Sequence, residues 1–256
     1  ECALALENEK TAREKEEAAI LAKNEQLRAN MLRAISHDLR TPLTAISGNA
    51  SNLLSNGADF DEDTRRQLYS DIYDDSLWLI NVVENLLSVT RIEDGRMALR
   101  PSAELVEEIV TEALNHVGRG RTDHVITFIC KDEWLMARAD ARLIVQVVVN
   151  IVDNALKYTP PGSHIDITAA REDDKVAVTI ADDGPGVPPE VGERVFDMFF
   201  SGSNRAADSR RSLGLGLALC RSIITAHGGI ISLSQNQPHG AVFRFTLPAE
   251  EVQWHE

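Results

Sequence analysis

Residues 143–159 read LIVQVVVNIVDNALKYT, and this stretch decides how the second half of the chain folds. Its apolar residues recur at helical spacing, which predicts a helix over about 140–157. Asn150, Asn154 and Lys157 share one face, and an apolar face is formed by Leu143, Val147, Ile151 and Ala155. Amide oxygens suit Mg²⁺ and a lysine suits phosphate, so the polar face is a candidate nucleotide site. A solvated helix face would give the same pattern, and the helix alone leaves both interpretations open.

The segments around this helix alternate between helix and strand patterns. IDITAA (165–170) and KVAVTIA (175–181) alternate in polarity and are adjacent, which predicts an antiparallel hairpin. The other predicted elements are helices near 104–116 and 214–227 and strands near 125–130, 134–139, 229–235 and 240–247. We therefore expect an α/β sandwich in which helices cover one face of a sheet.

The first half of the chain reads as two long helices joined by a turn. The first is predicted over about 7–54, and its charged start is expected to be a coiled-coil lead-in. Ser55-Asn56-Gly57 ends this helix, and the acids at 61–63 favour the start of the second. The second helix carries an apolar stripe of Leu68, Ile72, Leu79, Val82, Leu86 and Val89.

A stripe of this kind needs helical partners, and two copies of the hairpin would supply them as a four-helix bundle. We therefore expect a homodimer, the alternative being a hairpin packed on the rest of its own chain. The expected fold class is α+β with two domains. The lead-in and hairpin occupy 1–96, the α/β sandwich 97–249 and a tail 250–256, with a hinge at 95–101.

Charge and cysteine content exclude several classes of protein. A net charge of −14 repels a phosphate backbone, which argues against a nucleic-acid binder and restricts polyanionic ligands to small ones. Cys2, Cys130 and Cys220 are too far apart for a zinc motif or a disulfide framework, and they fit a reducing compartment. No apolar run approaches the roughly 18 residues of a membrane span. Because the chain opens at Glu1 in a helical pattern, we expect it to be part of a longer protein.

A histidine lies inside the first predicted helix, in the segment ISHDLRTPL (35–43). Pro42 removes a backbone donor, so the helix is expected to bend or loosen one turn after His37. Most helix histidines are surface residues, but here an acid follows directly and a proline lies one turn on. The functional interpretation makes His37 a nucleophile and Asp38 the group that orients its ring and accepts its proton. Thr41, on the same face as His37, could hold a hydrolytic water.

Two glycine-rich loops lie in the second half. Asp182-Asp183-Gly184-Pro185-Gly186 follows a predicted strand, and Asp182 offers an acceptor for the amine of adenine, although an ordinary turn would look the same. Leu213-Gly214-Leu215-Gly216-Leu217 opens a helix, where free N–H groups favour a triphosphate. A lid over the nucleotide is expected between the loops, with Arg194, Phe196, Phe199, Arg205, Arg210 and Arg211. No Walker loop, dinucleotide fingerprint or eukaryotic kinase catalytic loop is present in the sequence.

These four motifs, in this order over nearly the whole chain, resemble those of the sensor histidine kinases of bacterial two-component systems. The resemblance implies a phosphoacceptor and dimerisation hairpin followed by the Bergerat ATP-binding fold. It implies ATP and Mg²⁺ as cofactors, a response-regulator receiver domain as partner, and a place in the cytoplasmic portion of an inner-membrane sensor.

The resemblance also implies roles for particular residues. His37 would be the phosphoacceptor, Asp38 the general base and Thr41 a support for phosphatase activity, while Asn154 would bind Mg²⁺ and Asp182 adenine. The nucleotide site as a whole would comprise Asn150, Asn154, Lys157, Tyr158, Asp182, Gly184, Gly186, Phe199, Gly214, Leu215 and Gly216.

Within this family, the His37 segment and ISGNASNLL (46–54) look most like the potassium-responsive KdpD branch. One departure is Ser212, where the family usually has a glycine, and it puts lid closure in doubt. Two alternatives stay open: a Bergerat-fold ATPase without histidine phosphorylation, and a non-catalytic dimeric scaffold or phosphatase. The sequence leaves undecided whether His37 would attack the ATP of its own chain or of its partner.

Overall fold

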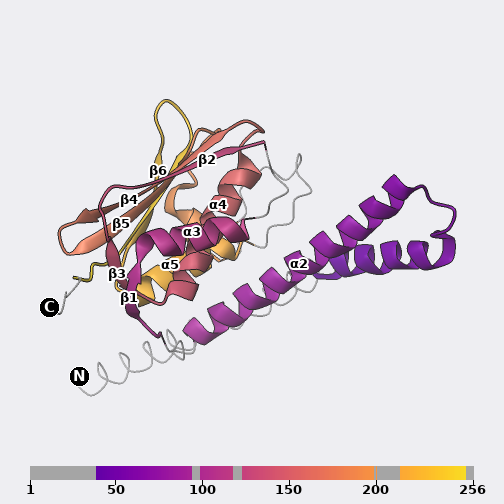
Figure 1. The fold of residues 1–256 in the computed structure, drawn as a ribbon, viewed down its shortest axis with the longest axis horizontal. Coiled ribbons are helices and arrows are strands. Elements are labelled where there is room, and N and C mark those ends of the chain that lie inside the picture. The colour runs from indigo at the N-terminus through magenta and orange to yellow at the C-terminus, as the bar shows by residue number, and fades with distance from the viewer. Residues whose placement is uncertain (1–38, 94–98, 118–122, 199, 201–213, 252–256) are drawn as a thin grey trace, which may run out of the picture. The chain divides into compact units, whose positions relative to one another are not determined.

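The computed structural model describes residues 39–93, 99–117, 123–198, 200 and 214–251 (Figure 1). The predicted lead-in, His37, Asp38, Phe199, most of the hinge and most of the lid lie outside these residues. The chain divides into two compact units, 1–82 and 83–256, which we describe separately. The predicted domain boundary at 96/97 stays a prediction.

A helical hairpin forms the first unit and extends past it. Residues 39–56 are helical through Pro42, and the hydrogen bond from Gly57 N to Leu53 O (3.1 Å) closes the last turn. The second helix, α2 (Glu62–Glu93), begins where Asp61 Oδ1 accepts a hydrogen bond from Thr64 N at 2.7 Å. Hydrogen bonds from Thr64 lower the pKa of Asp61, as expected for a carboxylate at a helix N-terminus. The stop at Gly57 and the acidic start at 61–63 are thus confirmed.

The α/β unit contains three helices and seven strands in its described residues. Its helices are α3 (Val106–His116), α4 (Ala141–Tyr158) and α5 (Gly216–Ala226), and a 3-10 helix, η1, spans Gly192–Phe196. Its strands are β1 (Ser102–Leu105), β2 (Val125–Cys130), β3 (Met136–Ala139), β4 (His164–Glu172), β5 (Lys175–Asp182), β6 (Ile231–Gln235) and β7 (Ala241–Pro248).

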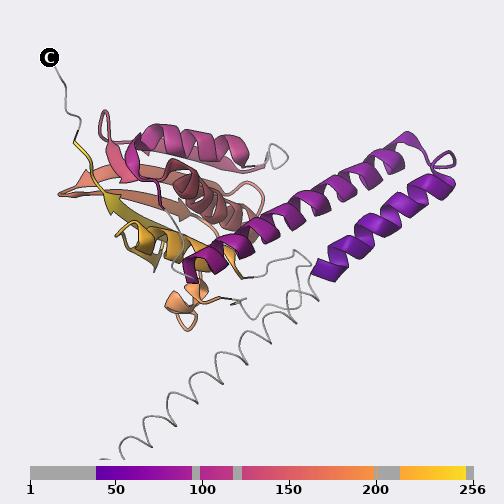
Figure 2. The same ribbon diagram turned by 90° about the horizontal axis from the view of Figure 1, so that it is seen from below.

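Five of these strands form one mixed sheet in the order β2-β4-β5-β7-β6. The pair β2–β4 is parallel, and the pairs β4–β5, β5–β7 and β7–β6 are antiparallel. Strands β1 and β3 form a separate antiparallel pair. Figure 1 shows the three helices on one face of the large sheet, and Figure 2 shows them side by side with α4 in the middle. This is the expected sandwich.

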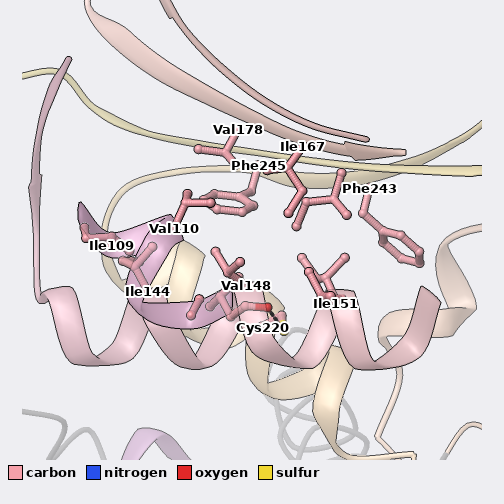
Figure 3. Close-up of a cluster of buried hydrophobic side chains, with 14 of the residues drawn as sticks. Ile109, Val110, Ile144, Val148, Ile151, Ile167, Val178, Cys220, Phe243 and Phe245 are labelled. Atoms are coloured by element: carbon pink, nitrogen blue, oxygen red, sulfur yellow. Dashed lines mark hydrogen bonds between the residues drawn. The ribbon is translucent and has the colours of Figure 1, made fainter. Parts of the chain in front are cut away.

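The core lies between the helices and the sheet. Figure 3 shows Ile144, Val148 and Ile151 of α4 pointing toward Ile167, Val178 and the phenylalanines of the sheet, Phe243 and Phe245. Because α4 is covered by α3, α5 and the sheet, it buries eight apolar residues: Ile144, Val145, Val147, Val148, Ile151, Val152, Ala155 and Leu156. That burial explains the nearly unbroken apolar run in its sequence.

Two boundaries differ from the predicted ones for reasons that the structure shows. The helix expected from 104 begins at Val106, because residues 102–105 pair with β3 as strand β1. The strand expected from 134 begins at Met136, because Trp134 has a φ of 56° and interrupts the extended chain. The parallel pairing of β2 with β4 and the short helix η1 have no counterpart in the sequence prediction. Among the described helices, none has the length and apolar character needed to cross a membrane.

Candidate functional site

Asp182 ends β5 and is the most sheltered carboxylate of the predicted site, with 7% of its surface exposed. Its Oδ1 accepts hydrogen bonds from Gly184 N at 3.0 Å and from Ala241 N at 3.1 Å. Burial raises the pKa of this carboxyl, as does the charge of Asp183, and the two backbone N–H groups oppose the rise. Both of these hydrogen bonds use Oδ1, and Oδ2 accepts none from the part of the chain that the structure describes.

The loop after Asp182 is closely packed, which explains its glycines. A Cβ on Gly184 would lie 2.4 Å from Thr159 Cγ2. Gly186 has a φ of +73°, and a Cβ there would lie 2.8 Å from Gly240 O. Side chains at these positions would push the loop away from its neighbours. The glycines therefore let the loop approach both the end of α4 and the β6–β7 turn.

The β6–β7 turn holds this loop in place. Asn236 Nδ2 donates to Asp182 O at 2.7 Å, and Gln235 Nε2 donates to Val187 O at 2.6 Å. His239 Nδ1 lies 3.2 Å from Gly184 O. The turn thus supports the loop through both backbone and side-chain contacts, and the sequence prediction did not include it.

A second part of the predicted site lies where α4 meets the start of α5. A Cβ on Gly216, the first residue of α5, would lie 3.6 Å from both Cγ and Oδ1 of Asn150. Asn150 Nδ2 is buried without a hydrogen bond of ordinary geometry among the described residues, although the Asn150 side chain interacts with the Cys220 thiol of α5 and tends to lower its pKa. Leu215 is 3% exposed and Gly214 has a φ of +64°. A buried donor beside a helix N-terminus suits a negatively charged oxygen.

His227 aligns these two helices. Its Nδ1 is 2.8 Å from Ile223 O within α5, and its Nε2 accepts a hydrogen bond from Asp140 N at 3.0 Å, just before α4 begins. The imidazole is buried, so both hydrogen bonds are shielded from water. This bridge fixes the start of α4 relative to the end of α5. Because Asn150 lies on α4 and Gly216 on α5, it also helps to fix the position of Asn150 relative to Gly216.

The remaining predicted residues are more exposed. Asn154 lies one turn after Asn150 and is partly exposed. Lys157 Nζ lies 5.1 Å from the centre of the exposed Tyr158 ring. Thr41 is exposed on the first helix of the hairpin. No group of three or more His, Cys, Asp and Glu side chains in the described part of the chain could hold a metal ion, so a cation here would depend on amide and nucleotide oxygens.

Two residues at the edge of the lid are described. Phe196 is buried and meets the Phe243 ring edge-on, with ring centres 6.3 Å apart. The guanidinium of Arg194 lies 5.1 Å from the centre of the Phe200 ring. The entrance to the lid segment is therefore anchored on the sheet by η1.

Thr159 and His124 also belong to this region, and the sequence prediction missed both. Thr159 follows α4, and its Oγ1 lies 3.0 Å from His124 Nε2. Its methyl group faces Gly184. Sequence patterns gave no signal for this contact, since the two residues come from a helix end and a strand start 35 positions apart.

Family models match both halves of the chain. The model described as "His Kinase A (phospho-acceptor) domain" matches residues 27–95, and that described as "Histidine kinase-, DNA gyrase B-, and HSP90-like ATPase" matches 139–251. The solved catalytic domain of the histidine kinase ThkA is 32% identical with a TM-score of 0.51, over 58% of this chain and 95% of that one. The chain therefore belongs to the histidine kinases, and its second domain is of the ATP-binding type.

Within this family, the chain is similar to sensor kinases of the KdpD type. The sensor protein KdpD of Clostridium acetobutylicum is 41% identical over 248 residues, which are 97% of this chain and 28% of that protein. The chain thus spans little more than a quarter of the length of this relative. A structure of the histidine kinase ThkA in complex with the response regulator protein TrrA is 27% identical with a TM-score of 0.62, over 86% of this chain and 61% of that one.

Proposed function

We propose that this chain binds Mg-ATP in its α/β unit, transfers the γ-phosphoryl group to His37, and passes it on to an aspartate of a response regulator. The observation that carries the proposal is the buried Asp182 carboxylate, fixed through Oδ1 by two backbone N–H groups. A fixed acceptor with Oδ2 available can read the exocyclic amine of adenine.

The two parts of the site suit the two ends of ATP. Asn150, beside the start of α5, and Thr159, beside the Asp182 loop, are separated by nine residues along α4, or about 14 Å at the rise of an α-helix. An extended nucleotide with its adenine at Asp182 would reach Asn150 with its phosphates. Gly214, Leu215 and Gly216 would then offer backbone N–H groups to the triphosphate.

Asn154 is the proposed Mg²⁺ ligand. Its amide oxygen is a hard neutral donor, and Asn154 lies one turn from Asn150 on the same helix. When bound with ATP, Mg²⁺ neutralises charge on the β- and γ-phosphates. Lys157 and Tyr158, on the following turn, and Phe199 complete the proposed nucleotide site, and Gly184 and Gly186 line its adenine end.

His37 and Asp38 carry the chemistry in this proposal. An unprotonated ring nitrogen of His37 attacks the γ-phosphorus, a new N–P bond forms, and the bond to the bridging oxygen breaks as ADP leaves. The ring gains positive charge, and Asp38 stabilises it by accepting the proton of the other ring nitrogen. Thr41 is proposed to orient water when the phosphoryl group is removed from the response regulator.

A homodimer is proposed because α2 carries an exposed apolar stripe. It consists of Tyr69, Tyr73, Leu77, Ile80, Val83 and Leu87, at spacings of three and four. Their exposed fractions range from 43% for Leu77 to 64% for Tyr73. A second hairpin would cover this stripe and complete a four-helix bundle. The stripe predicted from the sequence is instead partly buried where it is described, from Leu68 to Leu86.

The relatives support the proposed partner and location. The ThkA structure contains a response regulator, which supports a receiver domain as the partner of this chain. The KdpD relative is a sensor protein that is much longer than this chain, which supports a cytoplasmic portion of an inner-membrane sensor.

The test is incubation with Mg-ATP labelled at the γ-phosphate, comparing the chain with His37→Gln. His116→Gln is the matched control, because His116 is an exposed histidine on α3. We expect label on the parent chain and the control, lost in acid and kept in base, and none on His37→Gln. Label that persists in His37→Gln would refute His37 as the acceptor.

A further inference from the structure

The side chain of His124 lies against the adenine end of the proposed site without being one of its predicted residues. Its backbone position is fixed, because Val125 N donates to Ser163 O at 3.0 Å and β2 then runs parallel to β4 from the pair Val125–His164. On the other side, Asp123 O accepts from Gly162 N at 2.6 Å. The start of β2 is thus held beside the turn that follows Thr159.

The hydrogen-bond directions at Thr159 are determined by its single hydroxyl proton. Oγ1 donates that proton to Ala155 O at 2.8 Å, so it must accept from His124 Nε2 at 3.0 Å. The other ring nitrogen, Nδ1, is buried without a partner among the described residues, so this hydrogen bond is the one the structure gives the ring. Together the two hydrogen bonds fix the χ1 angle of Thr159.

This χ1 angle directs the methyl group, rather than the hydroxyl, toward the adenine end of the site. The point where Gly184 would carry a Cβ is 2.4 Å from Thr159 Cγ2 and 3.0 Å from Asp182 Oδ1, so both border the same small space. Rotation by one rotamer step would bring the hydroxyl to the side of Gly184 where the carboxylate lies. A hydroxyl there could donate to Asp182 Oδ1 and disturb the two backbone hydrogen bonds that hold the carboxylate in position for its ligand.

We propose that His124 is a positioning residue for adenine recognition: it holds the Thr159 hydroxyl on α4 and so keeps the Asp182 carboxylate available to the base. This proposal rests on the proposed role of Asp182 in binding adenine. His124 itself does not contact the nucleotide. Its contribution is that it prevents a competing hydrogen bond inside the protein.

The experiment measures Mg-ADP affinity by calorimetry for the full chain and four variants: His124→Phe, His124→Gln, Thr159→Val and the double variant His124→Phe with Thr159→Val. Each protein is also titrated with purine riboside diphosphate, which lacks the exocyclic amine. His116→Phe is the matched control at an exposed histidine.

We expect His124→Phe to weaken ADP binding about tenfold, the typical effect of one competing hydrogen bond, and to leave the amine-free analogue unaffected. Thr159→Val has no hydroxyl to misplace, so it should bind ADP as the parent does, and the double variant should match it. His124→Gln can still donate a hydrogen bond and should retain most of the affinity.

Equal loss for ADP and the amine-free analogue in His124→Phe would overturn the proposal, because a general structural defect weakens both. So would a double variant that binds no better than His124→Phe alone. If His124→Phe does not fold, His124→Gln is compared with His124→Asn instead. The shorter Asn side chain reaches Thr159 less well, so His124→Asn should lose affinity for ADP and not for the amine-free analogue. A parent chain that discriminates poorly between ADP and the analogue would instead refute the role of Asp182.

Discussion

The α/β unit and the helical hairpin bury their apolar residues in different ways. In the α/β unit, three helices and the large sheet enclose a continuous core, and residues such as Ile151 and Phe245 are fully covered. Among residues 39–80 and 82–87, whose burial the structure describes, only Pro42 and Val82 are buried, while α2 leaves a stripe of six large apolar residues exposed. The difference shows that the α/β unit encloses its own core, whereas the exposed stripe of the hairpin supports the proposed dimer.

The largest effect is expected when the exposed stripe of α2 receives a charge. Ile80→Glu would bury two unpaired carboxylates in the proposed dimer, one from each copy, which costs several kcal/mol. We expect the dimer dissociation constant to rise by more than about 1000-fold, measured by analytical ultracentrifugation. The control is Leu54→Glu, at the exposed end of the first helix. An unchanged dissociation constant for Ile80→Glu would remove the stripe from the interface.

A core substitution should affect the α/β unit without affecting the dimer. Phe245→Ala removes a fully buried ring and should lower the free energy of unfolding of this unit by about 3–5 kcal/mol. Urea denaturation followed by circular dichroism measures it, with Ile230→Ala, an exposed residue of the same unit, as the control. If Phe245→Ala also weakened the dimer, the two units would not be independent in stability.

Asp182→Asn should separate recognition from folding inside the α/β unit. The amide oxygen can still accept from Gly184 N and Ala241 N, but the Oδ2 position becomes a donor that faces the amine of adenine. We expect about 30- to 100-fold weaker binding of Mg-ADP by calorimetry. The free energy of unfolding should not fall, because burial raises the pKa of Asp182 and so disfavours its charged form at neutral pH.

The same pKa shift predicts the pH dependence of binding. Because the pKa of Asp182 is raised above the ordinary 3.8, acidification should protonate this acceptor earlier than it would an exposed aspartate. Nucleotide affinity should therefore decline on acidification before ordinary carboxylates titrate. Calorimetry across a pH series checks this, and a flat profile in Asp182→Asn would assign the decline to this residue.

The smallest effect is expected at the neighbouring Asp183. This residue tests how much a partly exposed carboxylate beside the site contributes to the stability of the fold. Burial would raise the pKa of Asp183, but hydrogen bonds from His164 and Ser163 outweigh it and leave the pKa lowered. A lowered folded-state pKa stabilises the fold above the unfolded-state pKa, and this stability is lost as pH falls. Asp183→Asn should therefore cost less than about 1 kcal/mol near pH 7. In denaturation experiments the difference from the parent should begin to shrink below about pH 4 and should vanish only below the lowered folded-state pKa.

Local patterns in the sequence predicted most of the fold. The alternation in β4 and β5 and the apolar period of α4 are strong signals, because each reflects one face of one element. The boundary of α3 was wrong because residues 102–105 pair with β3, a contact that no local pattern records. The second stripe of α2 was missed because it has the same spacing of three and four as the predicted stripe, and spacing alone does not show which apolar face of a helix is covered.

The candidate site was predictable only where its residues follow a turn or a helix period. Asp182 was found because an acid and two glycines follow a strand. Its second hydrogen-bond donor, Ala241, lies 59 residues later, and the contact arises from the register between β5 and β7. Thr159 and His124 depend in the same way on the parallel pairing of β2 with β4. Contacts of this kind come from topology, which the sequence alone did not resolve.

The hydrogen bond from Ala241 to Asp182 also bears on when the site can form during protein synthesis. The ribosome makes Asp182 and its loop well before Asn236, Gly240 and Ala241, which hold that loop in place. The growing chain therefore cannot complete the proposed adenine site until β7, the last strand in the described residues, has emerged and paired with β5. If Asp182 reads adenine as proposed, a nascent chain gains nucleotide affinity only after β7 has been translated.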